Sequence, residues 1–254
     1  MRNNERQERS VGISFIKKLE INVQECTAIA FVGGGGKTSL IFRLADELTE
    51  AGKKTVIVTT THMAQEPDRP LAENGELWAV RRNLSRYGYT IAAVTERESG
   101  KLCGLPDELL RKLKRECDVM LIEADGSRRL PLKVPEAWEP VIPEFADTVV
   151  GVAGLDALGR PIRLTAHRPG LTAAFLEKKP EEAVVPEDIV RIAASKIGMK
   201  KNVGNRLYRV YLNKADILPS SEIPEYICRE LKINGVQAAY GSLHYEEAER
   251  KKWK

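Results

Sequence analysis

The chain has 254 residues, of which 43% are hydrophobic and 30% charged, a composition typical of a globular protein with a core of its own. Its 40 Lys and Arg residues against 36 Asp and Glu give a net charge of only +4, and aromatic residues make up 6%, so we expect no nucleic-acid partner. The four cysteines lack C-x-x-C spacing, no apolar run approaches the roughly 18 residues of a membrane span, and the polar start is unlike a signal peptide, so we expect a cytoplasmic protein with no membrane partner.

The first 20 residues predict a tail, in which residues 11–19 carry enough apolar side chains to dock as a short amphipathic element. The run TAIAFV (27–32) then predicts a strand, and four glycines connect it to a helix that Gly52 is placed to cap. A second apolar run, 53–60, follows after a short connection. Strand, helix and strand with short connections predict a right-handed βαβ unit in a parallel sheet.

The alternation of strands and helices continues to the end of the chain. Two short strands near residues 76–104 predict an inserted hairpin, and four prolines in the segment 130–143 predict an extended stretch laid over the surface, of the kind that is usually functional. The other predicted elements are the helix 106–116, the strands 118–126 and 147–154, a helix built on Ile189, Ile192, Ala193 and Ile197, the strand 206–216, the helix 221–231 and the strand 235–243. We therefore expect one domain over residues 21–254, a three-layer α/β fold with helices on both faces of a mostly parallel sheet.

A glycine-rich motif between the first strand and its helix is the strongest signal. Its residues are Gly33, Gly34, Gly35, Gly36, Lys37, Thr38 and Ser39. Consecutive glycines let backbone N–H groups surround an anion, the helix N-terminus adds its dipole, Lys37 can reach the β- and γ-phosphates, and Thr38 can ligate Mg²⁺. Phe31 replaces the first glycine of the strict G-x-x-x-x-G-K-[ST] pattern, and Val32 stands where the variant loop of nucleotide-switch ATPases and GTPases carries a signature lysine. The motif predicts phosphate binding and leaves open what Val32 changes in catalysis.

Two carboxylates follow an apolar strand in the run LIEADG (121–126). Open α/β sheets place ligands at the carboxyl ends of their strands, so Glu123 or Asp125 can hold Mg²⁺ or orient an attacking water. We expect Thr38, Glu123 and Asp125 to be the metal ligands, and Lys37 with the two carboxylates to form the catalytic set. The alternative is that the carboxylates only cap a helix or solvate a loop.

The run NKAD at the end of a later strand matches the N-K-x-D element by which GTPases recognise guanine. We expect Asp216 to accept from the base N–H groups, Asn213 to fix the neighbouring loop, and Lys214 to join them in binding the nucleotide. The alternative is a polar turn without a ligand.

Six further residues are candidates for a substrate or switch role. They are Thr60, Thr61, His62, Arg128, Lys133 and His167. The threonines and His62 close the second strand, where a switch or substrate loop can lie, and the basic residues can bind phosphate or an anionic substrate. The alternatives are a hydrogen-bonded loop histidine and solvated surface charge.

The motifs FVGGGGKTSL, VIVTTTHM, LIEADGSRRLPLKVPEAWEPVIP, VAGLDALG, HRPG and LNKAD, in this order, resemble the YqeC-type family from about residue 20 to the C-terminus. The stretch ADGSRRLPLKVP is the most specific part. The resemblance implies a P-loop nucleotide-binding accessory protein for selenium-dependent molybdenum hydroxylases. More distantly, the motifs are similar to the GTPases that deliver nickel, which implies a SIMIBI-like fold.

Together these patterns predict a Mg²⁺-dependent protein that binds and hydrolyses GTP or ATP. The resemblance implies that it assists maturation of a molybdenum hydroxylase or its selenium-containing cofactor. The expected partners are the nucleotide and a molybdenum hydroxylase or cofactor-assembly protein, and a homodimer is left open. The rival is a phosphotransferase or nucleotidyltransferase that acts on a pterin-like acceptor bound by Thr60 to His62 and Arg128 to Lys133. A nucleotide-sensing scaffold with negligible turnover is a third reading.

Overall fold

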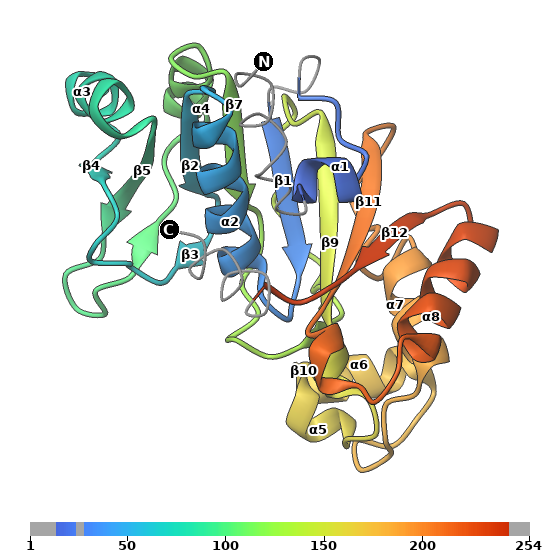
Figure 1. Ribbon diagram of the computed structural model, residues 1–254. Helices are drawn as coiled ribbons and strands as arrows, with labels where there is room; N and C mark the ends of the chain where they lie inside the picture. Colours follow the sequence, from blue (N-terminus) through green and yellow to red (C-terminus); the bar gives the residue numbers. More distant parts are fainter. Residues whose placement is uncertain (1–13, 24–27, 244–254) are drawn as a thin grey trace, which may run out of the picture.

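The computed structural model describes residues 14–23 and 28–243. Ten strands form one sheet in the order β12-β11-β9-β1-β7-β2-β5-β6-β3, with β4 beside β5 (Figure 1). They are β1 (Ala28–Gly33), β2 (Thr55–Thr59), β3 (His62–Met63), β4 (Leu71–Glu73), β5 (Tyr89–Thr95), β6 (Leu102–Cys103), β7 (Val119–Glu123), β9 (Thr148–Gly154), β11 (Leu207–Asn213) and β12 (Gln237–Tyr240). Among the described strands of this sheet, only the pairings of β6 with β3 and β5 are antiparallel, so the predicted mostly parallel sheet is confirmed. β8 (Leu132–Lys133) and β10 (Ala166–His167) form a separate parallel pair.

Helices cover both faces of the sheet. They are α1 (Phe15–Lys18), α2 (Lys37–Glu50), α3 (Leu77–Tyr87), α4 (Asp107–Lys114), α5 (Ile162–Thr165), α6 (Pro169–Leu176), α7 (Pro186–Ala194) and α8 (Glu222–Ile233). Apolar residues of α1 and α2 pack with Ile29 and Phe31 of β1, whereas those of α3, α4, α7 and α8 share a cluster with Ala30 and Val32. Alternate side chains of β1 thus enter opposite layers, and a strand buried on both faces must be apolar throughout. The three-layer α/β prediction is confirmed.

The region expected to be an inserted hairpin differs from the prediction. Its first part is the helix α3, and only its second part forms an antiparallel ladder, between β5 and β6. Val80 and Leu84 lie on the buried side of α3, and Gly88 ends the helix in the left-handed conformation. The short run ELWAV shows an apolar character common to strands and helices, and the helical spacing becomes visible only when Leu84 is included.

The proline-containing segment 130–143 is extended, as predicted, but its first half is not on the surface. Residues 131–135 are buried, and β8 within them pairs with β10. The prolines exclude a helix and a central strand, yet they allow a short two-stranded pair that covers the neighbouring glycine loop. The segment is therefore part of the site's wall.

The predicted amphipathic element near the N-terminus lies partly outside the described residues, which begin at residue 14. Within them, α1 docks on the sheet: Phe15 is fully buried, and its ring meets the Tyr211 ring edge-to-face at 5.5 Å between centroids. The Phe15 N–H also donates to the Glu47 carboxylate of α2 at 2.9 Å. The described part of this segment therefore docks, as its apolar residues predicted.

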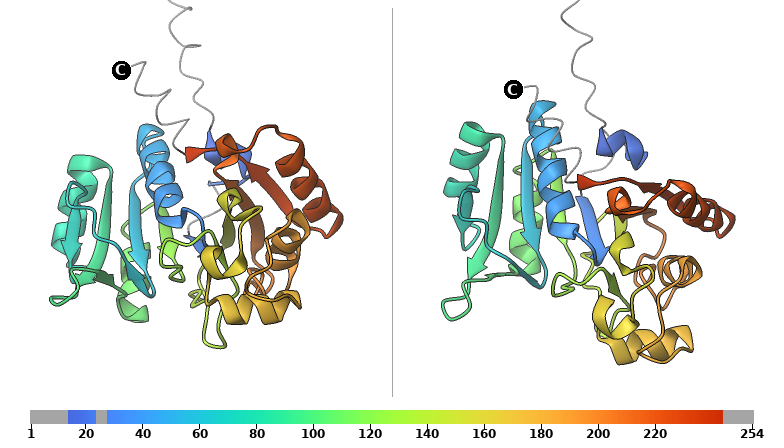
Figure 2. Two further views of the ribbon diagram at one scale, coloured as in Figure 1. Left: turned by 90° about the horizontal axis from the view of Figure 1, so that it is seen from below. Right: turned by 60° about the horizontal axis from the view of Figure 1, so that its bottom comes forward.

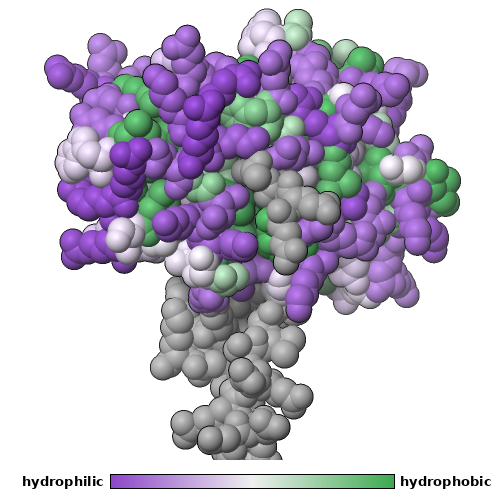
Figure 3. Space-filling model, turned by 90° about the horizontal axis from the view of Figure 1, so that it is seen from above, coloured by the Kyte–Doolittle hydropathy of each residue, from purple (hydrophilic) through white to green (hydrophobic). Residues whose placement is uncertain are grey.

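The carboxyl-terminal edge of the sheet faces downward in Figure 1 and toward the viewer in the left view of Figure 2. The glycine loop and the pair β8–β10 lie at this edge. The opposite edge presents mainly hydrophilic side chains (Figure 3). Within the described residues, no helix has both the length and the apolar character needed to cross a bilayer.

Candidate functional site

The glycine loop follows β1 directly and leads into α2. Gly33, Gly35 and Gly36 have φ angles of 94°, 73° and 121°, a region that residues with a side chain rarely adopt. A Cβ on Gly35 would lie 2.1 Å from the Gly154 nitrogen, and one on Gly36 would lie 2.4 Å from the Asn213 side-chain nitrogen. Glycine is therefore required here both by conformation and by space.

Two amides of the loop are already paired with backbone carbonyls of the chain. The Gly34 N–H donates to the Val152 carbonyl at 2.8 Å, and the Gly35 N–H donates to the Leu130 carbonyl at 3.0 Å. The amides of the first turn of α2 have no intrahelical acceptor, and Gly36 caps the helix without a side-chain hydrogen bond. An anion could bind at these first-turn amides directly, whereas it could reach Gly34 and Gly35 only by displacing the two carbonyls.

Lys37 is folded back onto its own loop. Its Nζ donates to the Gly33 carbonyl at 2.6 Å and lies 3.1 Å from Asp125 Oδ1, and the residue is 3% exposed. Asp125 also accepts the Gly33 N–H at 3.1 Å. The carboxylate thus stabilises the loop and holds the lysine beside it.

Thr38 and Glu123 meet at the other side of the loop. The Thr38 hydroxyl donates to Glu123 Oε2 at 2.6 Å, where β7 ends next to β1. Burial is the largest cause that raises the pKa of Glu123, and the charge of Asp125 adds to it, against the opposing effects of Lys37 and Thr38. A buried carboxylate beside a hydroxyl, with a raised pKa, is an oxygen site that a divalent cation would neutralise, so these two residues fit Mg²⁺.

Lys133 is fully buried in a chain of ion pairs that starts at Asp125. Its Nζ lies 3.4 Å from Asp125 Oδ2 and 2.9 Å from Glu139 Oε1, and it donates to the Gly126 carbonyl at 2.6 Å. Glu139 is also paired with Arg168 at 2.6 Å. Burial raises the pKa of Glu139, but hydrogen bonds from Lys133 and Arg168 outweigh this effect and hold the pKa below its ordinary value. Lys133 therefore contacts the protein itself in this structure, not an open substrate surface.

His167 and the arginine pair flank the same network. His167 Nδ1 lies 3.2 Å from the Gly126 carbonyl, and burial, with the charges of Arg168 and Lys133, lowers the pKa of its imidazole. Arg128 and Arg129 are exposed, and both are left-handed, with φ of 50° and 62°. The structure therefore brings His167 and Lys133 together around one carbonyl, while the two arginines form a strained turn beside the loop.

The NKAD motif places its three candidate residues, Asn213, Lys214 and Asp216, in three different environments. The Asn213 amide donates to the Gly35 carbonyl at 2.7 Å, so it fixes the glycine loop. Lys214 Nζ pairs with Asp156 Oδ2 at 2.6 Å, and Asp216 is exposed in the short 3₁₀ helix η2 (Ala215–Ile217). The motif thus reaches the loop through its asparagine and leaves its aspartate open to solvent.

The loop after β2 contacts the strand that carries Glu123. The Thr59 hydroxyl donates to the Glu123 carbonyl at 3.1 Å, and the Thr60 hydroxyl donates to the Val141 carbonyl at 2.8 Å. Thr61 donates its N–H to Thr59 Oγ1 at 3.1 Å. His62 is exposed on β3 and takes no part in these contacts. No contact among the described residues brings it together with His167.

Several contacting residues at the site were not among the predicted ones, and four of them show what the sequence did and did not reveal. They are Leu130, Glu139, Asp156 and Arg168. Leu130 acts through its backbone, which no residue-type pattern can reveal. Glu139 and Arg168 lie in the motifs PEAWEP and HRPG, and a search for partners of Lys133 among the charged residues of these motifs could have found them.

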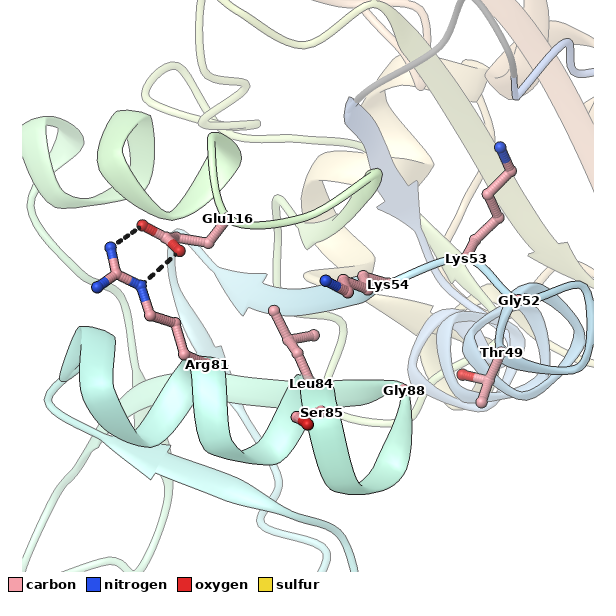
Figure 4. A pocket seen from close by; sticks show the side chains of 9 residues that line it. All are labelled: Thr49, Gly52, Lys53, Lys54, Arg81, Leu84, Ser85, Gly88 and Glu116. Atoms are coloured by element: carbon pink, nitrogen blue, oxygen red, sulfur yellow. Dashed lines mark hydrogen bonds and ion pairs between the residues drawn. The ribbon is translucent and has the colours of Figure 1, made fainter.

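A hollow of about 410 Å³ lies at the amino-terminal edge of the sheet (Figure 4). Its lining residues are Thr49, Gly52, Lys53, Lys54, Arg81, Leu84, Ser85, Gly88 and Glu116. Arg81 and Glu116 close one side through two hydrogen bonds of 2.8 and 2.7 Å. Because open α/β sheets bind their ligands at the carboxyl ends of the strands, the glycine loop and not this hollow is the candidate site.

The glycine loop connects a strand to a helix that begins at Lys37, and Thr38 is hydrogen-bonded to Glu123 on the adjacent parallel strand. This arrangement defines an α/β protein of the P-loop type. The sequence model of the YqeC protein family matches residues 29–170. The Escherichia coli (strain K12) protein named "Uncharacterized protein YqeC" is 30% identical over 224 residues, which cover 84% of this chain and 86% of that protein. The chain therefore belongs to the YqeC family, which confirms the resemblance of the motifs.

Among solved structures, an apo-form GTPase from Pyrococcus abyssi is similar over 87% of this chain and 92% of its own, with 14% identity and a TM-score of 0.36. The fold class rests on the strand order described above and not on this likeness.

Proposed function

We propose that this protein binds a nucleoside triphosphate with Mg²⁺ at the glycine loop and hydrolyses it as a step in the maturation of another protein or its cofactor. The observation that carries the proposal is the contact between Thr38 Oγ1 and Glu123 Oε2, at the start of α2 and beside Lys37. Hydroxyl, carboxylate, lysine and helix N-terminus are the groups that a Mg²⁺–triphosphate needs.

Binding would rearrange contacts that the structure shows. Lys37 would exchange the Gly33 carbonyl for a phosphate oxygen, while Asp125 would keep the Gly33 N–H and Lys133 as partners. Thr38 and Glu123 would hold the Mg²⁺, which supplies charge neutralisation of the phosphates. Asp125 already faces two lysines, so of the two predicted carboxylates Glu123 is the better metal ligand.

For the base, we propose guanine, recognised by Asp216. A carboxylate accepts two hydrogen bonds from the guanine N1–H and N2 amino group, whereas adenine offers an acceptor at N1 and no amino group at C2. Asn213 supports this assignment, because it ties the motif to the glycine loop at 2.7 Å. GTP is then expected to bind at least about tenfold more tightly than ATP, and Asp216→Asn to shift the preference toward xanthine nucleotides.

The maturation role, on a selenium-dependent molybdenum hydroxylase or its cofactor, is supported by the family resemblance of the motifs. Nucleotide turnover that rises with a purified hydroxylase would support it. Turnover that rises with a pterin-like molecule alone would instead support the phosphotransferase or nucleotidyltransferase reading.

The test of the core proposal is nucleotide binding with and without Mg²⁺ in the Thr38→Ala variant. We expect Mg²⁺ to tighten GTP binding in the unmodified protein. In Thr38→Ala we expect the same GTP affinity with and without Mg²⁺. Thr95→Ala is the matched control, because the Thr95 hydroxyl donates to Glu73 at the same 2.6 Å far from the loop. A Mg²⁺ effect that survives in Thr38→Ala would contradict the proposal.

A further inference from the structure

Three metal-binding side chains meet outside the glycine loop. One ligand atom each of His62, Glu96 and Cys103 lies within 4.8 Å of the other two. His62 and Glu96 are exposed, and Cys103 is half-buried with a free thiol. The glycine-loop proposal uses none of these three groups as a ligand.

The strand register explains why the three side chains share one face. His62 on β3 pairs directly with Cys103 on β6, and Cys103 pairs in turn with Val94 on β5. Cross-strand partners project to the same side of a sheet, and so do residues two apart along a strand. Glu96, two positions after Val94, therefore comes to the side on which His62 and Cys103 already meet. The antiparallel edge formed by β6 thus assembles residues that are 34 and 41 positions apart in the chain.

The donor set selects the class of metal. A thiolate and an imidazole favour a borderline transition metal such as Zn²⁺, whereas Mg²⁺ and Ca²⁺ prefer oxygen ligands. The Ser99 hydroxyl donates to Glu96 Oε2, which orients the carboxylate as outer partners of metal ligands do. We propose that His62, Glu96 and Cys103 form a Zn²⁺-type binding site, with three protein ligands and a fourth position open to water.

The site is linked by a series of hydrogen bonds to Glu123, which contacts Thr38 of the glycine-loop site. Gly104, next to Cys103, donates its N–H to the Thr61 carbonyl at 3.1 Å. Thr61 donates its N–H to Thr59, whose hydroxyl donates to the Glu123 carbonyl, both at 3.1 Å. β3 lies at the carboxyl-terminal edge (Figure 1), so a bound metal would fix the loop after β2 against the strand that carries Glu123. The metal site itself does not depend on nucleotide binding.

Co²⁺ is a suitable probe, because a thiolate ligand gives it a charge-transfer absorption that oxygen ligands do not give. We expect the full-length, tag-free protein, with Mg²⁺ in excess, to bind one Co²⁺ with this absorption, and Zn²⁺ to displace it. Cys103→Ser should abolish the absorption. His62→Ala and Glu96→Gln should each weaken Co²⁺ binding about tenfold or more.

Matched controls separate this site from other groups. Cys228→Ser should leave the absorption intact, because Cys228 lies on α8, which packs on β12 at the opposite end of the sheet from β3 and β6, and burial raises the pKa of its thiol to about 11. Thr38→Ala should also leave it intact, so a failure of the nucleotide proposal and a failure of this one are distinguishable. Absence of the absorption in the unmodified protein, or its survival in Cys103→Ser, would overturn the proposal.

Discussion

The side-chain amide of Asn213 donates to the carbonyl of Gly35 at 2.7 Å, across 178 residues of sequence. This bond joins the two nucleotide motifs of the chain. Asn213 Oδ1 in turn accepts the N–H of Lys214 at 2.8 Å and that of Leu243 at 3.4 Å. One buried amide thus holds the glycine loop, the turn after β11 and the end of the described chain in register.

Asn213→Ala should therefore loosen the glycine loop. It leaves the Gly35 carbonyl and two backbone N–H groups without this partner, so we expect a loss of about 1–3 kcal/mol in unfolding free energy and weaker nucleotide binding. Chemical denaturation and calorimetric titration measure the two effects. Asn202→Ala is the control, because its amide donates to the Pro140 carbonyl at 3.0 Å away from the loop. Equal nucleotide affinity in both variants would contradict the assigned role of Asn213.

Glu123→Gln should stabilise the protein without nucleotide while removing the effect of Mg²⁺. Because burial raises the pKa of Glu123 in the folded state, the folded protein binds more protons than the unfolded one between the two pKa values. The stability contributed by this group is present in acid and is lost as the pH rises through the folded pKa. At neutral pH we expect the melting temperature of the variant to exceed that of the unmodified protein by about 2 °C or more.

The difference in melting temperature between Glu123→Gln and the unmodified protein should shrink toward zero as the pH falls below the ordinary pKa range of glutamate. Both proteins are then uncharged at this position. Differential scanning calorimetry over a pH series checks the trend. A variant that is less stable at neutral pH would show that the carboxylate is held by stabilising contacts rather than strained by burial.

Lys133→Met should be strongly destabilising. The change removes the cation between two buried carboxylates, Asp125 and Glu139, and leaves the Gly126 carbonyl without its 2.6 Å donor. Breaking a buried ion pair on one side costs about 3–5 kcal/mol. Urea unfolding provides the measurement, with the exposed Lys112→Met expected to change stability by less than about 0.5 kcal/mol. A similar small change at Lys133 would mean that the network adds nothing to stability.

Arg129→Gly should raise the free energy of unfolding, whereas an Arg→Gly change in a helix lowers it. The turn from Ser127 to Leu130 is closed by a 3.0 Å hydrogen bond, and both of its central arginines are left-handed. The left-handed conformation costs a residue with a side chain about 1–2 kcal/mol, which exceeds the entropic cost of glycine. We expect unfolding free energy to rise by up to about 1 kcal/mol, and to fall by about 1 kcal/mol in Arg163→Gly on α5.

If the strained arginine pair serves the triphosphate, Arg129→Gly should also weaken nucleotide binding despite the gain in stability. Titration with GTP separates this outcome from a purely structural turn, in which affinity would stay constant.

The sequence predicted the parts of the site that are local. The apolar run before Gly33 and the helical spacing after Lys37 were sufficient for the βαβ unit and the loop, because hydrophobic periodicity and glycine reveal local conformation. The helix α3 was missed because a short apolar run does not separate helix from strand. The contact of His167 with the Gly126 carbonyl depends instead on tertiary packing that brings β10 beside β8, and no spacing along the chain encodes it.

The most direct test of the central claim is calorimetric titration of Mg²⁺–GTP into the protein and into Lys37→Ala, after circular dichroism has shown that the variant is folded. The account predicts at least a tenfold loss of affinity, about 1.4 kcal/mol, in Lys37→Ala. It predicts no loss in Lys54→Ala, whose side chain lines the hollow at the opposite edge of the sheet. Unchanged affinity in Lys37→Ala, or a loss only in Lys54→Ala, would contradict it.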